Sequence, residues 1–335
     1  MSKLLEVKNV DRHFDISGSI VDQLSFKGGK ITREKTLVKA VNNVSLDIRK
    51  GETLSVVGES GCGKSTLART VMGLYQPNAG EIHYDGTRID TLTGRRRRPY
   101  RTRMQMVFQD PYASLNPRMT VKQILEEPVR FHNPNLNRKE VRDIILTTMD
   151  QVGVNTAWID NFAHEFSGGQ RQRISLARAL VLDPEFVAAD EPIAALDVSI
   201  QAQILNLMMD AQEQRGLTYL FISHDLSVVE HISTRVAVMY LGCLCELADV
   251  KELFGNPQHP YSRALLSAIP RLGGQAGGHI RLSGDVPTPI NLPSGCVFHG
   301  RCPHADERCR TEVPELLTLE SGTSVACHGI EEGRV

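Results

Sequence analysis

The feature of this sequence that most restricts its fold is the octapeptide GESGCGKS at residues 58–65. It follows a short apolar run, TLSVVG, and opens a helical pattern, KSTLARTVMGLY, so it predicts a strand, a tight loop and a helix. The spacing G-x-x-x-x-G-K-S lets successive backbone N–H groups turn toward a phosphate, to which the start of the helix adds partial positive charge. We therefore predict an α/β fold that holds a nucleoside triphosphate.

Each residue of such a loop has an expected task. Lys64 should reach the β- and γ-phosphates, and the Ser65 hydroxyl should ligate Mg²⁺. The remaining contacts with the nucleotide are expected from the neighbouring residues Gly58, Ser60, Gly61, Cys62, Gly63 and Thr66.

Two further apolar runs, PEFVAADEP and LTYLFISHD, have the compact form of parallel strands buried under helices. The first run ends in Asp190 and Glu191. In enzymes with a phosphate loop, an aspartate at this place holds the magnesium shell, and an adjacent glutamate polarises the attacking water. Beside a phosphate loop, the pair therefore predicts a role in triphosphate hydrolysis at the end of that strand.

Length and composition set the broad class. A chain of 335 residues has room for one large domain with an appendage, or for two domains. A formal net charge of −1 excludes recruitment of nucleic acid or lipid by the field of the whole protein. The first sixteen residues lack the apolar run of a signal peptide, and no window holds about 18 uninterrupted apolar residues. We expect a cytoplasmic protein that docks on a membrane protein.

Six arginines fall between residues 95 and 103, at positions 95–98, 101 and 103. Such a run is typical of a solvated surface loop, which we predict here. Contact with anionic lipid headgroups is the alternative. No aromatic stacking platform or helix-turn-helix pattern accompanies the run, so we predict no nucleic-acid partner.

Four ordered segments carry a family resemblance: VFQDP around Gln109, FSGGQRQRISLARAL at 166–180, DEPIAALD at 190–197 and SHD at 223–225. With the phosphate loop, they resemble the ATP-binding cassette (ABC) family. The resemblance implies a RecA-like α/β core with an antiparallel β subdomain and a helical subdomain near residues 110–165. It places an ATPase domain at 1–260 and a cysteine-bearing extension at 261–335.

The resemblance also implies catalytic roles, position by position. Glu191 matches the general base, and His224 matches the switch histidine that contacts the γ-phosphate. Gln109 matches the residue that touches Mg²⁺ and water and links the site to the helical subdomain, and Asp190 matches the aspartate of the magnesium shell.

Other matched positions concern adenine and the second subunit. Phe14 occupies the place of the aromatic that stacks on adenine, with a core phenylalanine as the alternative. The signature residues Ser167, Gly168, Gly169 and Gln170 match a helix start that faces the ATP of the other subunit, so the resemblance implies a head-to-tail dimer. Ala194 departs from the serine usual in relatives, and a non-hydrolysing regulatory subunit is the corresponding alternative.

The segments FQDPYASLNPRMTVKQILEEP and NPQHPYSRALLSAIP resemble the ATPase subunits of dipeptide and oligopeptide importers. That resemblance implies a second, related ATPase in a heterodimer, two membrane permeases and an extracytoplasmic binding protein. It places the chain at the cytoplasmic face of the inner membrane. ATPases of nickel or glutathione importers, and a soluble cassette ATPase acting on nucleic acid, are the alternatives.

Four of the seven cysteines, Cys296, Cys302, Cys309 and Cys327, lie close to the C-terminus. In a reducing cytosol stable disulfides are not expected. Four thiolates suit zinc or a 4Fe–4S cluster, although no C-x2-C pair is present. The resemblance to peptide-importer ATPases favours the 4Fe–4S cluster, with zinc and free thiols as alternatives.

Overall fold

The computed structural model describes two compact units that alternate along the chain. It covers residues 2–17, 24–27, 30–33, 35–194, 196–269, 280–282, 284 and 287–335, with the backbone alone for 24–27 and 30–33. Unit 1 comprises Met1–Leu4, Ile48–Ser55 and Thr91–Ser223, and unit 2 comprises Leu5–Asp47, Val56–Asp90 and His224–Val335.

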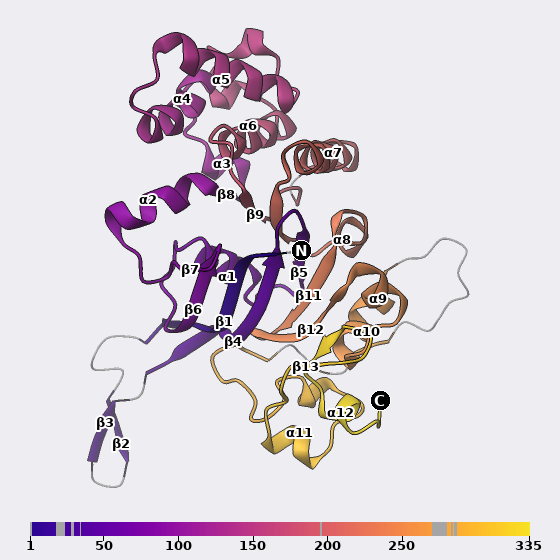
Figure 1. Cartoon of the computed structure of the whole chain (residues 1–335). Coiled ribbons are helices and arrows are strands. Elements are labelled where there is room, and N and C mark those ends of the chain that lie inside the picture. The colour runs from indigo at the N-terminus through magenta and orange to yellow at the C-terminus, as the bar shows by residue number, and fades with distance from the viewer. Residues whose placement is uncertain are drawn as a thin grey trace. The chain divides into compact units, whose positions relative to one another are not determined.

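Unit 1 is built on parallel strands that are buried on both faces. Strands β8 (Met104–Val107), β9 (Phe186–Asp190) and β10 (Thr218–Ile222) lie in the order β10-β9-β8. Every residue of β9 and β10 is buried, and both pairings of β9 are parallel (Figure 1). The prediction of buried parallel strands is confirmed, because continuous apolar runs suit a sheet covered on both sides.

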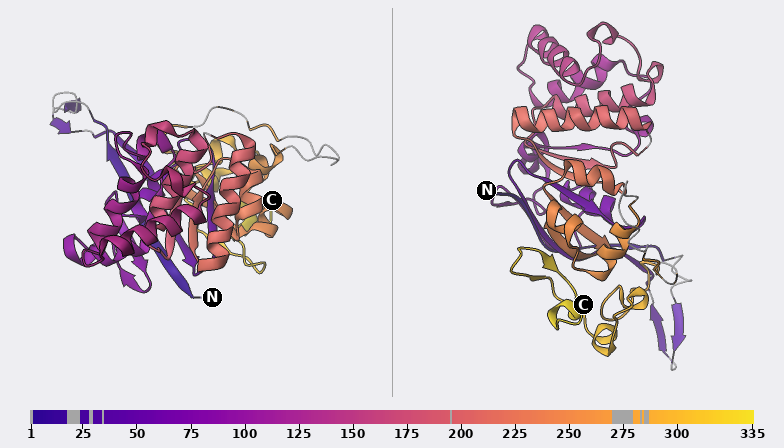
Figure 2. Two further views of the ribbon diagram at one scale, coloured as in Figure 1. Left: turned by 90° about the horizontal axis from the view of Figure 1, so that it is seen from above. Right: turned by 90° about the vertical axis from the view of Figure 1, so that its right-hand side faces the viewer.

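Helices surround and extend this sheet. They are α2 (Gly94–Arg103), α3 (Pro111–Ser114), α4 (Val121–His132), α5 (Arg138–Gln151), α6 (Gly168–Leu180) and α7 (Val198–Arg215), with short η1 (Thr156–Trp158) and η2 (Ala163–Glu165). Capping boxes start α4 at Thr120 and α5 at Asn137, which satisfies backbone donors that a helix start leaves free. Helices α4, α5 and α6 pack on one another, and α7 packs on α6 (Figures 1 and 2).

The prediction that the arginine run at 95–103 forms a surface loop is wrong. The run forms helix α2 instead, because arginine is a good helix former. Arg97 is buried, and Arg103 makes an ion pair of 2.8 Å with Glu185. The guanidinium of Arg98 lies 5.1 Å from the ring centroid of Phe131. Part of the run is therefore committed to contacts inside unit 1.

Unit 2 begins with a four-stranded sheet of order β4-β1-β6-β7. Its strands are β1 (Lys3–Asp15), β4 (Leu37–Arg49), β6 (Ala79–Tyr84) and β7 (Thr87–Arg88). The pairings of β6 with β1 and with β7 are antiparallel, as the predicted β subdomain requires. Strands β2 (Leu24–Lys27) and β3 (Lys30–Arg33), which lie between β1 and β4 in the sequence, pair antiparallel with each other.

The C-terminal part of the chain is built into unit 2. Strands β11 (Arg235–Tyr240), β12 (Cys243–Asp249), β14 (Ser324–Val325) and β13 (Leu317–Thr318) pair in the order β13-β14-β12-β11. Strand β5 (Thr53–Val57) follows β11, and its last two residues belong to this unit. The helices are α1 (Lys64–Val71), α8 (Leu226–Ile232), α9 (Val250–Gly255), α10 (Pro260–Ser267), α11 (Glu307–Thr311) and α12 (His328–Glu331), with η3 (His299–Arg301). Pairing of β14 with β12 ties the last residues to the sheet.

One apolar cluster spans the core of unit 2 and the C-terminal extension. It includes Val57, Tyr240, Tyr261, Phe298 and Cys296. Within the described residues, no helix is both long enough and apolar enough to cross a bilayer.

His259 gives the fold a pH dependence. The residue is buried, and its Nδ1 accepts the N–H of Tyr261 at 3.0 Å, which caps α10. Burial lowers the pKa of His259 from 6.5 to about 3, so below pH 6.5 the unfolded chain binds a proton that the folded chain does not.

We expect the free energy of unfolding to fall by about 2 kcal/mol between pH 7 and pH 5 on account of this residue alone. Urea denaturation followed by circular dichroism at the two pH values measures the effect. His259→Asn keeps a capping acceptor and removes the titration, so its pH dependence should be weaker by that amount. Equal pH dependence in both proteins would contradict the assignment.

Candidate functional site

The phosphate loop joins β5 to α1, and its backbone carbonyl groups contact the side chain of its own lysine. Lys64 is buried, and its Nζ donates to the carbonyl oxygens of Gly58 at 2.8 Å and Glu59 at 3.0 Å. Gly63 caps α1 in the left-handed conformation, with φ of 101°. The first turn of α1 leaves backbone N–H groups without intrahelical acceptors. The loop therefore has the strand–loop–helix form that the sequence predicts.

Two glycines of the loop are fixed by close backbone contacts. A Cβ at Gly58 would lie 2.1 Å from the carbonyl oxygen of Met239, and a Cβ at Gly63 would lie 1.9 Å from that of Ala40. Gly61 has a φ of 78° but an open environment. The loop is thus pressed against β4 and β11 at Gly63 and Gly58 and faces outward at Gly61.

Cys62 fills the space beneath the loop. Its sulfur lies 3.7 Å from Lys64 Nζ, and its side chain is buried. Burial raises the pKa of the Cys62 thiol, and the Lys64 charge opposes this only in part. Cys62 is therefore a neutral packing residue at neutral pH. Ser60 is exposed, while Ser65 and Thr66 are half-buried at the start of α1.

The predicted acidic residues and Gln109 lie in unit 1. Asp190 is fully buried at the end of β9. Glu191 follows with a φ of 46°, and its side chain accepts a hydrogen bond of 2.9 Å from Gln109 Nε2. A non-glycine residue with positive φ stores strain that clusters at functional sites. The structure thus brings Gln109 and Glu191 together although they are 82 residues apart.

The signature segment forms the start of α6. The Ser167 N–H donates to Gln170 Oε1 at 2.9 Å, and the Gln170 N–H donates to Ser167 Oγ at 3.4 Å. Ser167 is exposed, and Gly168 and Gly169 are half-buried. A Cβ at Gly169 would lie 2.6 Å from Ile200 Cγ2. The capping box thus lies at the exposed N-terminus of a 13-residue helix, where the helix dipole places a positive partial charge.

His224 and Phe14 belong to unit 2. His224 is exposed between the end of β10 and Asp225, which caps α8 through the N–H groups of Ser227 and Val228. Because Asp225 fixes the start of α8, the segment that carries His224 is held at both ends.

Phe14 is half-buried and so is not a core residue. Its ring contacts Tyr75 edge to face, with centroids 5.3 Å apart, and the Arg12 guanidinium lies 4.5 Å from its centroid. No local pattern points to Tyr75 or Arg12, because contact between distant segments depends on the register of β1 and on the path of the chain after α1. These three residues form an aromatic and cationic cluster between β1 and the chain that follows α1.

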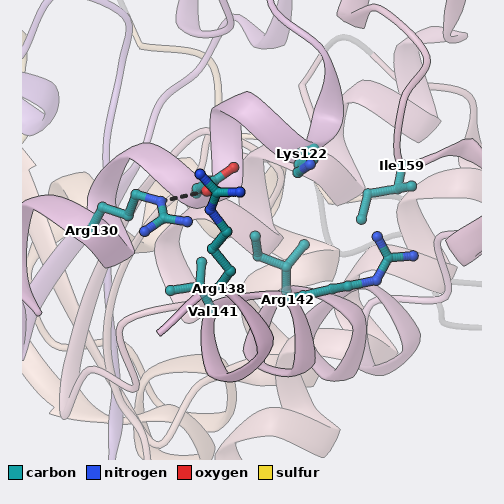
Figure 3. Close-up of a pocket in the computed structure, with 8 residues that line it drawn as sticks. Lys122, Arg130, Arg138, Val141, Arg142 and Ile159 are labelled. Atoms are coloured by element: carbon teal, nitrogen blue, oxygen red, sulfur yellow. Dashed lines mark hydrogen bonds and ion pairs between the residues drawn. The ribbon is translucent and has the colours of Figure 1, made fainter. Parts of the chain in front are cut away.

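A basic pocket of 570 Å³ lies between α4 and α5 and was not predicted from the sequence. Figure 3 shows Lys122, Arg130, Arg138 and Arg142 around it. Arg130 pairs with Glu126, whereas the other three cations make no ion pair with the residues that the structure describes. The helical subdomain therefore presents a concave face of positive charge.

The four C-terminal cysteines all lie in unit 2. Burial raises the pKa of Cys296 to about 12, and the nearby thiols of Cys309, Cys327 and Cys302 add to this shift. The N–H of Cys296 donates to the carbonyl oxygen of Cys309 at 2.8 Å. Among the described residues, no group of three or more His, Cys, Asp or Glu side chains is placed to hold a metal ion. The thiols are neighbours, but they do not form a preassembled metal site.

Comparison with known families supports the order of these motifs. Residues 41–194 match the family model described as ABC transporter. Residues 245–309 match the model described as oligopeptide/dipeptide transporter, C-terminal region. The two matches are consecutive, and the second reaches into the C-terminal extension.

Curated relatives match over nearly their whole length. The oligopeptide transport ATP-binding protein AppF of Bacillus subtilis (strain 168) is 49% identical over 97% of this chain and 97% of its own. The dipeptide transport ATP-binding protein DppF of Haemophilus influenzae is 50% identical over 88% of this chain and 90% of its own. Among solved structures, the post-hydrolysis dimer of the ATP-binding cassette MJ0796 bound to ADP and Pi has a TM-score of 0.63 at 26% identity, covering 74% of this chain and 99% of that chain.

The two glycines Gly63 and Gly61 allow a matched test of the loop. Gly63→Ala should lower the free energy of unfolding by about 3–5 kcal/mol, because a Cβ there meets the Ala40 carbonyl and the left-handed φ adds strain. Gly61→Ala has the strain without the clash and should cost about 1–2 kcal/mol. Chemical denaturation of both variants measures the difference, and equal costs would contradict the close approach of the loop to β4.

Proposed function

This chain belongs to the ABC transporter family, in its oligopeptide and dipeptide branch, and we propose that it hydrolyses ATP to drive import of dipeptides or oligopeptides through a membrane permease complex. The observation that carries the proposal is the succession of an ABC match at 41–194 and an oligopeptide/dipeptide transporter match at 245–309 in one chain. Relatives named as oligopeptide and dipeptide transport ATP-binding proteins match over 88–97% of the chain and support the same branch.

In the proposed site, the phosphate loop of unit 2 holds the triphosphate. Its backbone N–H groups and the start of α1 would receive the phosphate oxygens. Lys64 would donate to the β- and γ-phosphates, and Ser65 would ligate Mg²⁺. Cys62 is neutral and so adds no negative charge beside the triphosphate, which supports the phosphate-binding role of this loop.

We assign the roles in hydrolysis residue by residue. Glu191 would act as general base for the attacking water, and its hydrogen bond to Gln109 supports a shared role in placing that water. Asp190, buried at the end of β9, would complete the magnesium shell. His224 would contact the γ-phosphate, and Phe14 would stack on adenine beside Tyr75.

A dimer completes the proposal. The exposed start of α6, with Ser167, Gly168 and Gly169, would face the γ-phosphate held by a second ATPase chain, because a helix start attracts anions. We propose that this second chain is a related but different ATPase. Ala194 is exposed three residues after Glu191, and the lost hydroxyl would alter the contact between the two chains.

The membrane partners are two permeases and an extracytoplasmic binding protein, which place the chain at the cytoplasmic face of the inner membrane. We propose that movement at Gln109 reaches the permeases through the helical subdomain, whose basic concave face suits an acidic partner segment. Nickel or glutathione remains the alternative cargo. The proteins that co-purify from membranes identify the second ATPase and the cargo class.

We retain a 4Fe–4S cluster as the proposed occupant of the four cysteines. The number and type of donors support it, together with the hydrogen bond of 2.8 Å from the Cys296 N–H to the Cys309 carbonyl oxygen. The cysteines would have to draw together around the metal, since the described residues hold no preassembled group. Zinc and free thiols are the alternatives.

Glu191→Gln tests the hydrolytic assignment. In the assembled complex we expect ATP hydrolysis to fall by about 100-fold or more, because a general base contributes 10²–10⁴-fold, while ATP binding persists. Phosphate release and equilibrium nucleotide binding are measured on the same preparations. Glu213→Gln, an exposed glutamate of α7, is the matched control and should retain full turnover. Steady phosphate release by Glu191→Gln would overturn the assignment.

Anaerobic purification tests the metal assignment. We expect about four iron and four sulfide per chain. Cys302→Ser should lose most of this iron, whereas Cys243→Ser, outside the four-cysteine set, should retain it. Iron, sulfide and zinc analysis distinguishes the cluster from the zinc and free-thiol alternatives, and an iron-free anaerobic preparation would contradict the cluster.

A further inference from the structure

The second residue of the phosphate loop, Glu59, is held by the C-terminal extension. Arg301 Nη1 donates to both oxygens of its carboxylate, at 2.9 and 3.1 Å. The side chains of Glu59 and Arg301 are 25% and 10% exposed. An ion pair this sheltered is screened less by salt than one on the open surface. It is therefore a specific contact between the loop and the extension.

A second contact fixes the backbone of the same residue. The N–H of Glu59 donates to the hydroxyl oxygen of Tyr261 at 2.9 Å, and Tyr261 is fully buried in α10. The carbonyl oxygen of Glu59 in turn accepts from Lys64 Nζ at 3.0 Å. Glu59 thus connects Arg301 and Tyr261 to the lysine that would bind the phosphates.

Arg301 and Tyr261 are themselves held rigidly. Arg301 Nη1 also donates to the Tyr240 hydroxyl at 3.3 Å. The ring of Phe298 lies 5.3 Å from that of Tyr240 and 5.4 Å from that of Tyr261, in the distance range of favourable aromatic pairs. Phe298 and Arg301 both lie in the segment 296–302, which begins and ends with a cysteine.

The charge of Glu59 needs a partner if this loop binds a nucleotide. A carboxylate in a loop that encloses a triphosphate is a like charge and disfavours the anion. Arg301 cancels that charge, while Tyr261 keeps the Glu59 carbonyl directed at Lys64. Removal of Arg301 would leave a sheltered carboxylate without its ion-pair partner.

We propose that Arg301 and Tyr261 are positioning residues for ATP binding, through which the C-terminal extension completes the phosphate loop. Arg301 neutralises Glu59, and Tyr261 fixes its backbone. This inference rests on the proposed function, in which the loop at 58–65 holds ATP. It assigns to the extension a part in nucleotide affinity that is separate from any ligand of the cysteines.

The test measures the affinity of the full-length chain for a fluorescent ATP analogue with Mg²⁺. Arg301→Gln should weaken binding about five- to tenfold, as expected for a coupled charge pair. The double variant Glu59→Gln with Arg301→Gln should return to within about twofold of the parent, because both charges are then absent. Tyr261→Phe, which keeps the ring, should weaken binding about threefold through the lost hydrogen bond.

Arg308→Gln is the matched control for Arg301→Gln. Arg308 lies in the same extension and pairs with Glu312, Glu331 and Glu332, none of which belongs to the loop. It should leave affinity unchanged, which would separate the role of Arg301 from general loosening of the extension. Circular dichroism checks that each variant folds. If Arg301→Gln does not fold, the affinity of Tyr261→Phe still tests the proposal.

Three outcomes would overturn the inference. Affinity could be unchanged in both Arg301→Gln and Tyr261→Phe, the double variant could bind as weakly as Arg301→Gln, or Arg308→Gln could weaken binding equally. Lys64→Ala distinguishes these results from failure of the proposed function. If Lys64→Ala also leaves binding unchanged, the loop is not the ATP site, and the role of Arg301 falls with it.

Discussion

The close approach of the glycine-rich loop to two backbone segments is the contact on which unit 2 depends. Gly63 lies against the Ala40 carbonyl of β4, and Gly58 lies against the Met239 carbonyl of β11. The N–H of Gly242, after β11, donates to the Cys62 carbonyl at 2.9 Å and so closes the third side. Only residues without a Cβ fit at such contacts, because the space is already filled by backbone oxygen. The shape of the loop is therefore set by the sheet before any nucleotide binds.

The same arrangement explains why the C-terminal extension cannot be treated as an appendage. Strand β14 pairs with β12, and Phe298 packs against both Tyr240 and Tyr261 in one apolar cluster. Burial of these aromatic rings stabilises the extension and the loop at once, since they share one apolar cluster. A change in the segment 296–302 thus reaches the phosphate loop through contacts that already exist.

Much of this fold could be predicted from local sequence patterns, whereas contacts between distant segments could not. The loop at 58–65 and the buried strands β9 and β10 follow from patterns of residues that are adjacent in sequence. The arginine run was wrongly predicted as a loop, because its charge suggested solvent while helix propensity and packing of Arg97 decided the structure. The pair of Glu59 and Arg301 could not be predicted, since 242 residues separate them and only the folded sheet brings them together.

Thermodynamic linkage also implies an effect of ATP on the Glu59–Arg301 pair. If the pair increases affinity for ATP, bound ATP must stabilise the pair by the same free energy, because coupling between two sites is reciprocal. The segment 296–302 would then be held more firmly when the loop is occupied. That segment begins and ends with a cysteine, so a ligand that bound these thiols and moved Arg301 would also change the affinity for ATP. On this proposal the ion pair is a physical route by which a change in the segment 296–302 would reach the phosphate loop.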